Sequence, residues 1–388
     1  MKIAFFSNFL NHHQLPLCQD FLNASGVEFI FVATEPIEKE RLEMGYEDMN
    51  LYPFVLRAYE HGEEACILAK ECDVMIFGSA PIKYLKLRME ENKPTFYFTE
   101  RLLRKGYFRR FIPTTRKKIN EQYINYKDKN LYALCASAFA SYDLKLCGFN
   151  KDKCFKWGYF PKIVEKDLAK LMDEKDKNER VEILYAGRLL KLKRVMDTVK
   201  ALNLLVKRGV KNFKFTIIGE GEEKKRIERY IKKRKLDGYI QILPFTSPDK
   251  VREWMDLTDV YVFSSNMFEG WGAVMNEALN SACAVVVSHS VGSAPYLIKS
   301  GENGLIYACG KVKDLASRLE KVIADKEFRR EIALKGYQTI TSEWTSDIAT
   351  ERLLKLCNNL SESSSLYESG ILSIATPLKN DWIKGEKI

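Results

Sequence analysis

The sequence predicts an α/β protein made of two Rossmann-like domains, each with a parallel sheet covered by helices on both faces. Short apolar runs rich in β-branched and aromatic residues recur along the chain, and segments of helix length separate them. The 388 residues are enough for two domains of ordinary size, each with its own core. A densely charged stretch, residues 162–180, divides the apolar runs into two halves.

The predicted strands are continuous apolar runs, which is typical of strands buried on both faces of a parallel sheet. In the first half they are Lys2–Ser7, Val27–Ala33, Asp73–Phe77, Thr95–Thr99, Leu131–Cys135 and a weaker Cys154–Trp157. In the second half they are Glu182–Ala186, Lys214–Ile218, Ile240–Leu243, Val260–Ser264, Ala284–Ser288 and a short Leu305–Tyr307. The charged stretch between the halves follows Pro161 and is typical of a linker or a surface helix.

Composition favours a globular cytoplasmic protein. Apolar residues make up 46% of the chain and charged residues 29%, as in soluble domains, and no apolar run approaches the ~18 residues that span a bilayer. The first eight residues have a strand pattern rather than that of a signal peptide. Nine cysteines without a Cys-x-x-Cys motif indicate reduced thiols. The four histidines share no motif with them, so we expect no metal site.

The most informative segment is FEGWGAVMNE, from Phe268 to Glu277, which lies between a strand-like run and a helix-like run. Gly270 and Gly272 would lie at a helix N-terminus, where free N–H groups and the helix dipole favour an anion such as a phosphate. Glu277 would lie one to two turns into the helix, within reach of a hydroxyl pair such as a ribose diol. The alternative is a tight strand-to-helix turn in which Glu269 and Glu277 are merely solvated.

A second candidate site follows the first strand of the second half, in the segment YAGRLLKLKR. A strand that ends in Gly187-Arg188, with Lys193 five residues later, can place two cations beside a diphosphate. Arg provides a planar fork and Lys a compact charge. Lys191 and Arg194 compete with Lys193 for this role, and the segment alone could be an ordinary basic start of a helix.

These two segments, in this order, resemble the Gly-Arg-Leu-x-x-x-Lys and Glu-x7-Glu motifs of retaining glycosyltransferases of the GT-B fold, family 4 (group 1). The resemblance implies that Arg188 and Lys193 neutralise a departing diphosphate without a metal. It also implies that Glu269 contacts the transferred sugar and that Glu277 binds the ribose of the nucleotide. The resemblance is strong over residues 181–345 and looser over the first half.

Further donor contacts are implied by the same resemblance. Gly219 belongs to a strand-Gly-x-Gly pattern near the nucleotide, where a structural turn is the alternative for Gly221. Phe245 follows the strand whose end contacts the base. The donor-binding residues implied in addition to Glu277 are Gly187, Gly219, Phe245, Gly270, Trp271, Gly272 and Ala273. The ending SHSVGSAP … GENGLIY also resembles the family, and His289 within it is expected to be structural.

The GT-B resemblance implies two Rossmann-like domains facing across a cleft, with the C-terminal segment returning to the N-terminal domain. We expect an acceptor-binding domain over residues 1–160, a linker over 161–180 and a nucleotide-sugar donor domain over 181–345. A helix and tail over residues 346–388 would cross back to the first domain.

The acceptor side is expected in the first half. The loop NFLNHHQ after the first strand enters a helix, and we favour His12 over His13 as the histidine that faces a ligand. The alternative for His13 is a role at the start of the helix. Glu100 follows the strand Thr95–Thr99 and is a candidate to orient the acceptor hydroxyl or the sugar. A surface ion pair with Arg101 is the alternative.

Much of the net charge of +10 comes from residues 101–118, which contain eight Lys or Arg residues, no acid, and interleaved aromatic and aliphatic side chains. Such a patch can lie on an anionic membrane surface. A solvated loop and an anionic acceptor are the alternatives. A nucleic acid could also be steered by it, but no nucleic-acid-binding motif accompanies the patch, so we expect no such partner.

The resemblance therefore implies a retaining, metal-independent hexosyltransferase that uses a UDP- or GDP-sugar and no cofactor. The basic patch over residues 101–118 favours an acceptor that is a glycan or lipid-linked glycan in cell-surface polysaccharide assembly, with the protein at the inner face of the plasma membrane. A double displacement would require Glu269 as the nucleophile. The family architecture instead favours front-face transfer, in which the leaving diphosphate helps deprotonate the acceptor. A nucleotide-sugar epimerase, a phosphorylase and a non-catalytic binding subunit are the alternatives.

Overall fold

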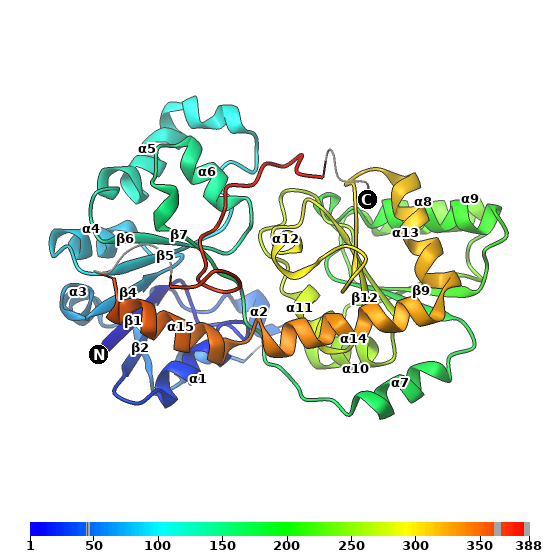
Figure 1. The fold of residues 1–388 in the computed structure, drawn as a ribbon, viewed down its shortest axis with the longest axis horizontal. Helices are drawn as coiled ribbons and strands as arrows, with labels where there is room; N and C mark the ends of the chain where they lie inside the picture. The colour runs from blue at the N-terminus through cyan, green and yellow to red at the C-terminus, as the bar shows by residue number, and fades with distance from the viewer. Residues whose placement is uncertain (44, 46, 361–365, 384–388) are drawn as a thin grey trace. The chain divides into compact units, whose positions relative to one another are not determined.

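The computed structural model has the predicted α/β fold, with two Rossmann-like units that each contain a parallel sheet (Figure 1). It describes residues 1–43, 45, 47–360 and 366–383. One unit contains Met1–Lys162 and Trp344–Lys379, and the other contains Ile163–Glu343 with residues 380–383. Of the predicted C-terminal tail, residues 361–365 and 384–388 lie outside the described part.

The sheet of the first unit has seven parallel strands in the order β3-β2-β1-β4-β5-β6-β7. Its strands are β1 (Lys2–Ser7), β2 (Glu28–Ala33), β3 (Val55–Arg57), β4 (Val74–Phe77), β5 (Thr95–Thr99), β6 (Leu131–Cys135) and β7 (Cys154–Lys156). Its helices are α1 (Leu15–Asn23), α2 (Lys39–Glu43), α3 (Gly62–Glu71), α4 (Ile82–Glu90), α5 (Pro113–Gln122), α6 (Ala140–Leu146) and α15 (Ser346–Asn358).

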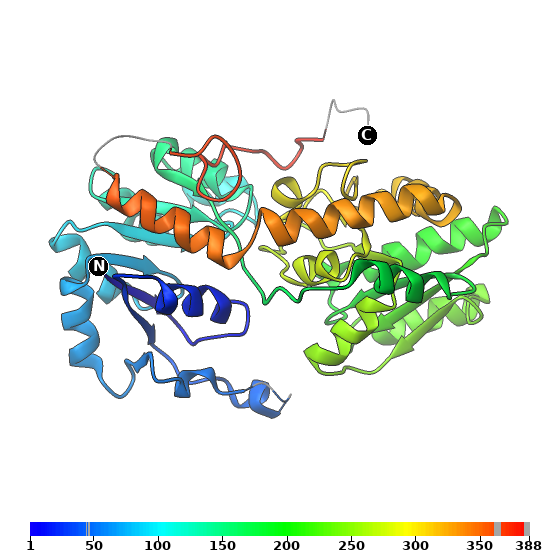
Figure 2. The same cartoon turned by 60° about the horizontal axis from the view of Figure 1, so that its bottom comes forward.

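The C-terminal segment is attached to this unit at two places. Helix α15 packs beside α1, as Figure 2 shows. Beyond it, the backbone N–H groups of Leu372 and Ala375 donate to Lys156 and Cys154 of the edge strand β7. These bonds satisfy an otherwise unpaired sheet edge, which stabilises both the edge and the returning segment.

The sheet of the second unit has six parallel strands in the order β10-β9-β8-β11-β12-β13. Its strands are β8 (Val181–Ala186), β9 (Phe213–Ile218), β10 (Ile240–Leu243), β11 (Val260–Phe263), β12 (Ala284–Ser288) and β13 (Leu305–Tyr307). Its helices are α7 (Leu168–Asp176), α8 (Val195–Lys207), α9 (Lys224–Arg234), α10 (Pro248–Asp256), α11 (Val274–Asn280), α12 (Ala294–Leu297), α13 (Val312–Ala324) and α14 (Lys326–Ser342).

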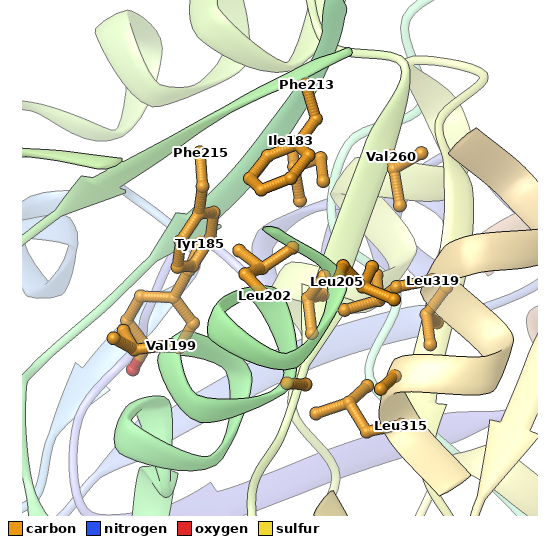
Figure 3. Close-up of a cluster of buried hydrophobic side chains, with 14 of the residues drawn as sticks. Ile183, Tyr185, Val199, Leu202, Leu205, Phe213, Phe215, Val260, Leu315 and Leu319 are labelled. Atoms are coloured by element: carbon orange, nitrogen blue, oxygen red, sulfur yellow. The ribbon is translucent and has the colours of Figure 1, made fainter. Parts of the chain in front are cut away.

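A continuous hydrophobic core fixes these strands against the helices on one face of the second sheet (Figure 3). Helix α8 presents Val199, Leu202 and Leu205 to the sheet, a spacing that places them on one side of a helix. Leu315 and Leu319 of α13 extend the same cluster. This packing therefore fixes the strands whose ends form the candidate donor site.

The predicted strands are confirmed in both halves, with shifts of one residue at some ends. The short β3, which is half-buried throughout, was not predicted. The charged stretch between the halves contains α7, whose Lys175 is buried and donates to the carbonyl oxygens of Ser281 (2.7 Å) and Ala282 (2.8 Å). Within the described residues, every helix is too short or too polar to cross a membrane.

Candidate nucleotide-sugar and acceptor sites

The candidate donor site lies at the point where the strand order of the second sheet changes direction. Strands β9 and β10 follow β8 on one side, while β11, β12 and β13 extend on the other side. The loops that follow β8 and β11 therefore leave the sheet next to each other. Ligands of open α/β sheets bind at such switch points, beyond the carboxyl ends of the strands. These two loops carry the Gly-Arg and Glu-x7-Glu segments.

The structure brings Lys193 and Glu269 together at this switch point, although 76 positions separate them. The Lys193 ammonium lies 2.5 Å from Oε2 of Glu269, and both side chains are mostly buried. The Ser265 hydroxyl donates to the same oxygen at 2.8 Å. The Ser264 hydroxyl donates to the backbone carbonyl of Lys193 at 2.7 Å, which ties the two loops together. The site therefore contains a positioned cation next to an oriented carboxylate.

The other cations of this segment have different surroundings. Arg194 pairs with Asp197 of α8, with its Nη2 2.6 Å from the carboxylate, and is thus engaged away from Glu269. Arg188 and Lys191 are exposed. Within the described part of the chain, neither forms a salt bridge. Arg188 lies two residues beyond the end of β8, which places this exposed residue at the switch point.

Glu277 lies on α11 and is largely buried near Arg252 of α10, with a distance of 3.7 Å from Oε1 to Nη2. Burial raises the pKa of the Glu277 carboxyl, and the Arg252 guanidinium opposes this shift. A ligand hydroxyl that donates to the carboxylate would lower the cost of keeping its charge in this setting. The Glu277 carboxylate is thus placed to accept a hydrogen bond from a ligand.

The loop between Glu269 and α11 is held by its backbone and by one buried aromatic side chain. Gly272 has a φ of +84°, and a Cβ at this position would collide with the ring of Phe263. Trp271 is buried, and its indole N–H donates to Asn276 Oδ1 at 3.0 Å. The indole ring therefore packs inside the unit, so of Trp271 only backbone atoms can face a donor. Gly270 and Ala273 flank these two positions.

Gly187 and Gly219 lie against each other at the ends of β8 and β9. A Cβ on Gly219 would overlap the carbonyl oxygen of Gly187, and both residues have a φ close to +150°. The two glycines thus allow the loops after β8 and β9 to approach closely. Phe245, which follows β10, is 46% exposed and its ring remains available to stack on a flat ligand.

His289 is structural, as expected. Its Nδ1 accepts the backbone N–H of Cys309 at 2.9 Å, and its Nε2 lies 3.0 Å from the carbonyl oxygen of Asn380. Burial lowers the pKa of this imidazole. The ring is therefore neutral and anchors residues near 380 to the second unit.

On the acceptor side, Glu100 lines a cavity of about 640 Å³ that lies entirely within the first unit. The cavity is at the switch point of the first sheet, because Ser7 ends β1, Gly78 follows β4 and Glu100 follows β5. The Tyr159 hydroxyl donates to Glu100 Oε1 at 3.2 Å. Burial and the nearby Glu100 carboxylate raise the pKa of Tyr159, so its hydroxyl remains a donor.

The structure does not bring His12 into this cavity. Asn8, Asn11 and Gln14 of the same loop line it, whereas the ring of His12 packs on that of His13 with centroids 3.7 Å apart. The histidine pair is thus a neighbour of the cavity wall rather than part of it.

Arg101 is buried, which corrects two expectations. Its guanidinium pairs with the buried Asp143 of α6 at 3.4 Å, and Asp143 also accepts the backbone N–H of Leu103 at 2.8 Å. A surface ion pair with Glu100 is therefore wrong, since Arg101 is not on the surface. For the same reason Arg101 does not belong to the exposed basic patch expected over residues 101–118.

Leu103 is buried as well, whereas residues 104–118 are exposed or half-exposed. Phe108 and Phe111, on the 3₁₀ turn before α5, are 63% and 70% exposed. The guanidinium of Arg110 lies over the ring of Phe111 at 4.4 Å. Cations and exposed aromatic rings thus share one surface, which we call the basic aromatic surface (residues 104–118).

Three residues of these sites were not identified from the sequence. Arg252 and Ser265 contact the two glutamates of the donor site, and Tyr159 contacts Glu100. Ser265 is within four residues of Glu269 and could have been found by its proximity. The other two come from distant segments, and nothing in their local sequence indicates a role.

Comparisons with known proteins agree with this architecture. Residues 169–339 match the family model described as glycosyl transferases group 1. The capsular polysaccharide biosynthesis glycosyltransferase CapM of Staphylococcus aureus is 26% identical over 189 residues, which cover 48% of each chain. The lipopolysaccharide core biosynthesis glycosyltransferase LpsE of Rhizobium meliloti is 26% identical over 140 residues, 36% of this chain and 40% of the relative. The matches thus span about half the length of these curated relatives, or less.

The fold extends over both units. The crystal structure of Anabaena Alr3699/HepE in complex with UDP superposes with a TM-score of 0.69 at 16% identity, covering 94% of this chain and 100% of that one. A likeness at this identity establishes the fold, which is GT-B.

Proposed function

We propose that the protein is a retaining glycosyltransferase, because residues 169–339 match the model of the group 1 glycosyl transferases and the chain has the GT-B fold. It moves a sugar from a nucleoside diphosphate sugar to a glycan or lipid-linked acceptor. The observation that carries this proposal is the Lys193–Glu269 pair at the switch point of the second sheet. Arg188 is exposed on the same loop as Lys193, and Glu277 lies eight residues beyond Glu269.

Each donor-site residue has a role that its surroundings support. Arg188 and Lys193 bind the diphosphate, because they are cations on a strand-end loop at the switch point. Glu277 accepts hydrogen bonds from the ribose diol. Phe245 stacks on the base, and the backbone of Gly270–Ala273 contacts the sugar and phosphate. In this proposal the two cations supply the charge that a metal ion would otherwise bring.

Transfer proceeds on the front face of the sugar. The bond between the anomeric carbon and the diphosphate oxygen breaks, the bond to the acceptor oxygen forms on the same face, and the departing diphosphate takes the acceptor proton. Arg188 and Lys193 stabilise the negative charge that grows on the diphosphate. Glu269 holds sugar hydroxyls, because its Oε2 is already committed to Lys193 and Ser265. A nucleophilic role would require it to leave both partners.

The names of relatives support the acceptor class and the donor. CapM and LpsE are named for capsular polysaccharide and lipopolysaccharide core biosynthesis, and a third relative from Staphylococcus aureus is named a poly(ribitol-phosphate) α-N-acetylglucosaminyltransferase. Structures of HepE and of TarM contain UDP. We therefore infer a role in cell-surface polysaccharide assembly and place UDP before GDP as the nucleotide of the donor.

Calorimetric titration of UDP, GDP and ADP, without added metal, tests the donor site. One nucleotide is expected to bind, and Glu277→Ala should weaken its affinity about 10- to 100-fold, since a hydrogen bond to a charged group is lost. Glu253→Ala, which removes an exposed glutamate on α10, serves as the matched control. If no nucleotide binds, or if both variants bind as the wild type does, the donor-site proposal fails. Turnover of the sugar nucleotide only with an added acceptor separates transfer from epimerisation.

We also propose that the basic aromatic surface places the enzyme on the inner face of the plasma membrane. Exposed Phe108 and Phe111 can insert at the lipid interface while the neighbouring cations contact anionic headgroups. Phe108→Ser/Phe111→Ser should reduce sedimentation with phosphatidylglycerol vesicles at least about tenfold, because each ring loses about 1.5–3 kcal/mol of burial. Leu257→Ser removes a similarly exposed apolar side chain from the second unit and should have no effect. Equal binding of all three proteins would refute the contact.

A further inference from the structure

The cavity of the first unit has the position and size of a substrate site. It encloses about 640 Å³, which lies within the range of small-molecule pockets. Its walls come from the ends of β1, β4 and β5 and from α5. Since it lies at the switch point of its sheet, the acceptor is the substrate that it would take.

The lining of this cavity is polar and carries one acidic side chain, Glu100. Asn8, Asn11 and Gln14 contribute amides from the loop after β1, and Thr115 contributes a hydroxyl from α5. Such groups suit the hydroxyls of a sugar rather than an apolar ligand. The polar wall alone does not specify the charge of the acceptor.

The charges of the lining give that information. Of its three cations, Arg101 is neutralised by the buried Asp143. Arg104 and Lys118 are exposed, and in the described ranges of the chain neither forms a salt bridge. Glu100 accepts the hydroxyl of Tyr159. With Arg101 neutralised by Asp143, the cations Arg104 and Lys118 outnumber the one lining carboxylate, Glu100, so the wall keeps a net positive charge that favours an anionic ligand.

We propose that the acceptor carries a phosphate group and that Arg104 and Lys118 bind it in this cavity. This inference rests on the proposed glycosyltransferase function, since it concerns the acceptor of that reaction. Arg104 offers a planar pair of donors to two phosphate oxygens, and Lys118 adds a compact charge. The phosphate is that of a lipid-linked glycan or of a phosphate-containing soluble glycan, because both present the same group to the two cations.

The test is titration of inorganic phosphate into the full chain carrying Arg188→Ala/Lys193→Ala. That background removes the two cations of the donor site, so that remaining anion binding reports on the first unit. Adding Arg104→Ala/Lys118→Ala is expected to weaken phosphate binding about tenfold or more, since two charged hydrogen-bond donors are lost. Adding Lys105→Ala/Lys117→Ala instead removes the same charge from adjacent positions that do not line the cavity. This matched variant is expected to keep the affinity.

The outcomes separate the alternatives. Equal weakening by the two double variants would overturn the proposal in favour of diffuse attraction to the basic aromatic surface, and absence of saturable phosphate binding would overturn it outright. Nucleotide binding by the chain that keeps Arg188 and Lys193 tests the proposed function independently of phosphate binding.

Titration of dodecyl phosphate distinguishes the two sources of the phosphate group. If dodecyl phosphate binds more tightly than inorganic phosphate and still depends on Arg104 and Lys118, the acceptor is lipid-linked, whereas equal affinity indicates a soluble glycan phosphate.

Discussion

Replacing Lys193 by alanine is expected to lower kcat for sugar transfer by about two to three orders of magnitude. In the proposed reaction Lys193 stabilises the charge that grows on the leaving diphosphate, and removing one such preorganised donor typically has an effect of about this size. The same change also leaves the mostly buried Glu269 carboxylate without the Lys193 cation, while the hydrogen bond from Ser265 remains. The measurement is steady-state release of the nucleoside diphosphate in the presence of acceptor.

Lys191→Ala is the matched control, because Lys191 is exposed and carries the same charge two residues before Lys193. Its kcat should stay close to that of the wild type. A comparable loss in both variants would mean that the segment acts only through its net positive charge. A Lys193→Ala enzyme with unchanged kcat would show that the Lys193–Glu269 pair is structural and that the reaction takes place elsewhere.

The fold could be predicted from the sequence because strands buried on both faces of a parallel sheet are continuous apolar runs. The run Val260–Ser264 begins directly after Asp259, and both it and Ala284–Ser288 end in a serine, so these ends were also nearly correct. Strand β3 (Val55–Arg57) escaped this criterion, since it has three residues, all half-buried, and one of them is an arginine. Its existence depends on pairing with β2, which local sequence does not encode.

The candidate site could be predicted only in part. The resemblance supplied Lys193 and Glu269 as separate residues, and their direct contact follows from the adjacency of β8 and β11 in the sheet. Arg252 was missed, because an arginine on a helix surface has no local pattern that pairs it with Glu277. Arg101 was assigned to the wrong environment for the same reason. Its partner Asp143 lies 42 residues away, and only tertiary packing buries the two together.

The buried Arg101–Asp143 pair is the point at which a single substitution should destabilise the first unit most. Asp143→Ala removes the buried carboxylate that faces the Arg101 guanidinium, and it removes the acceptor for the backbone N–H of Leu103. Breaking a buried ion pair in this way costs about 3–5 kcal/mol. Hydrogen–deuterium exchange is the measurement, and backbone amides of residues 101–103 and of α6 should exchange about a hundredfold faster or more.

A double variant separates charge from shape. Arg101→Met/Asp143→Leu removes both charges, so it should recover most of the protection that Asp143→Ala loses. If the double variant exchanges as fast as the single one, the ion pair is not the cause. Because Arg101 and Leu102 line the cavity, Asp143→Ala should also weaken phosphate binding there while leaving nucleotide affinity unchanged. Such a split would follow from the architecture, since the pair supports the strand-end loop that carries Glu100 and Arg104, and the donor-site residues lie in the other unit.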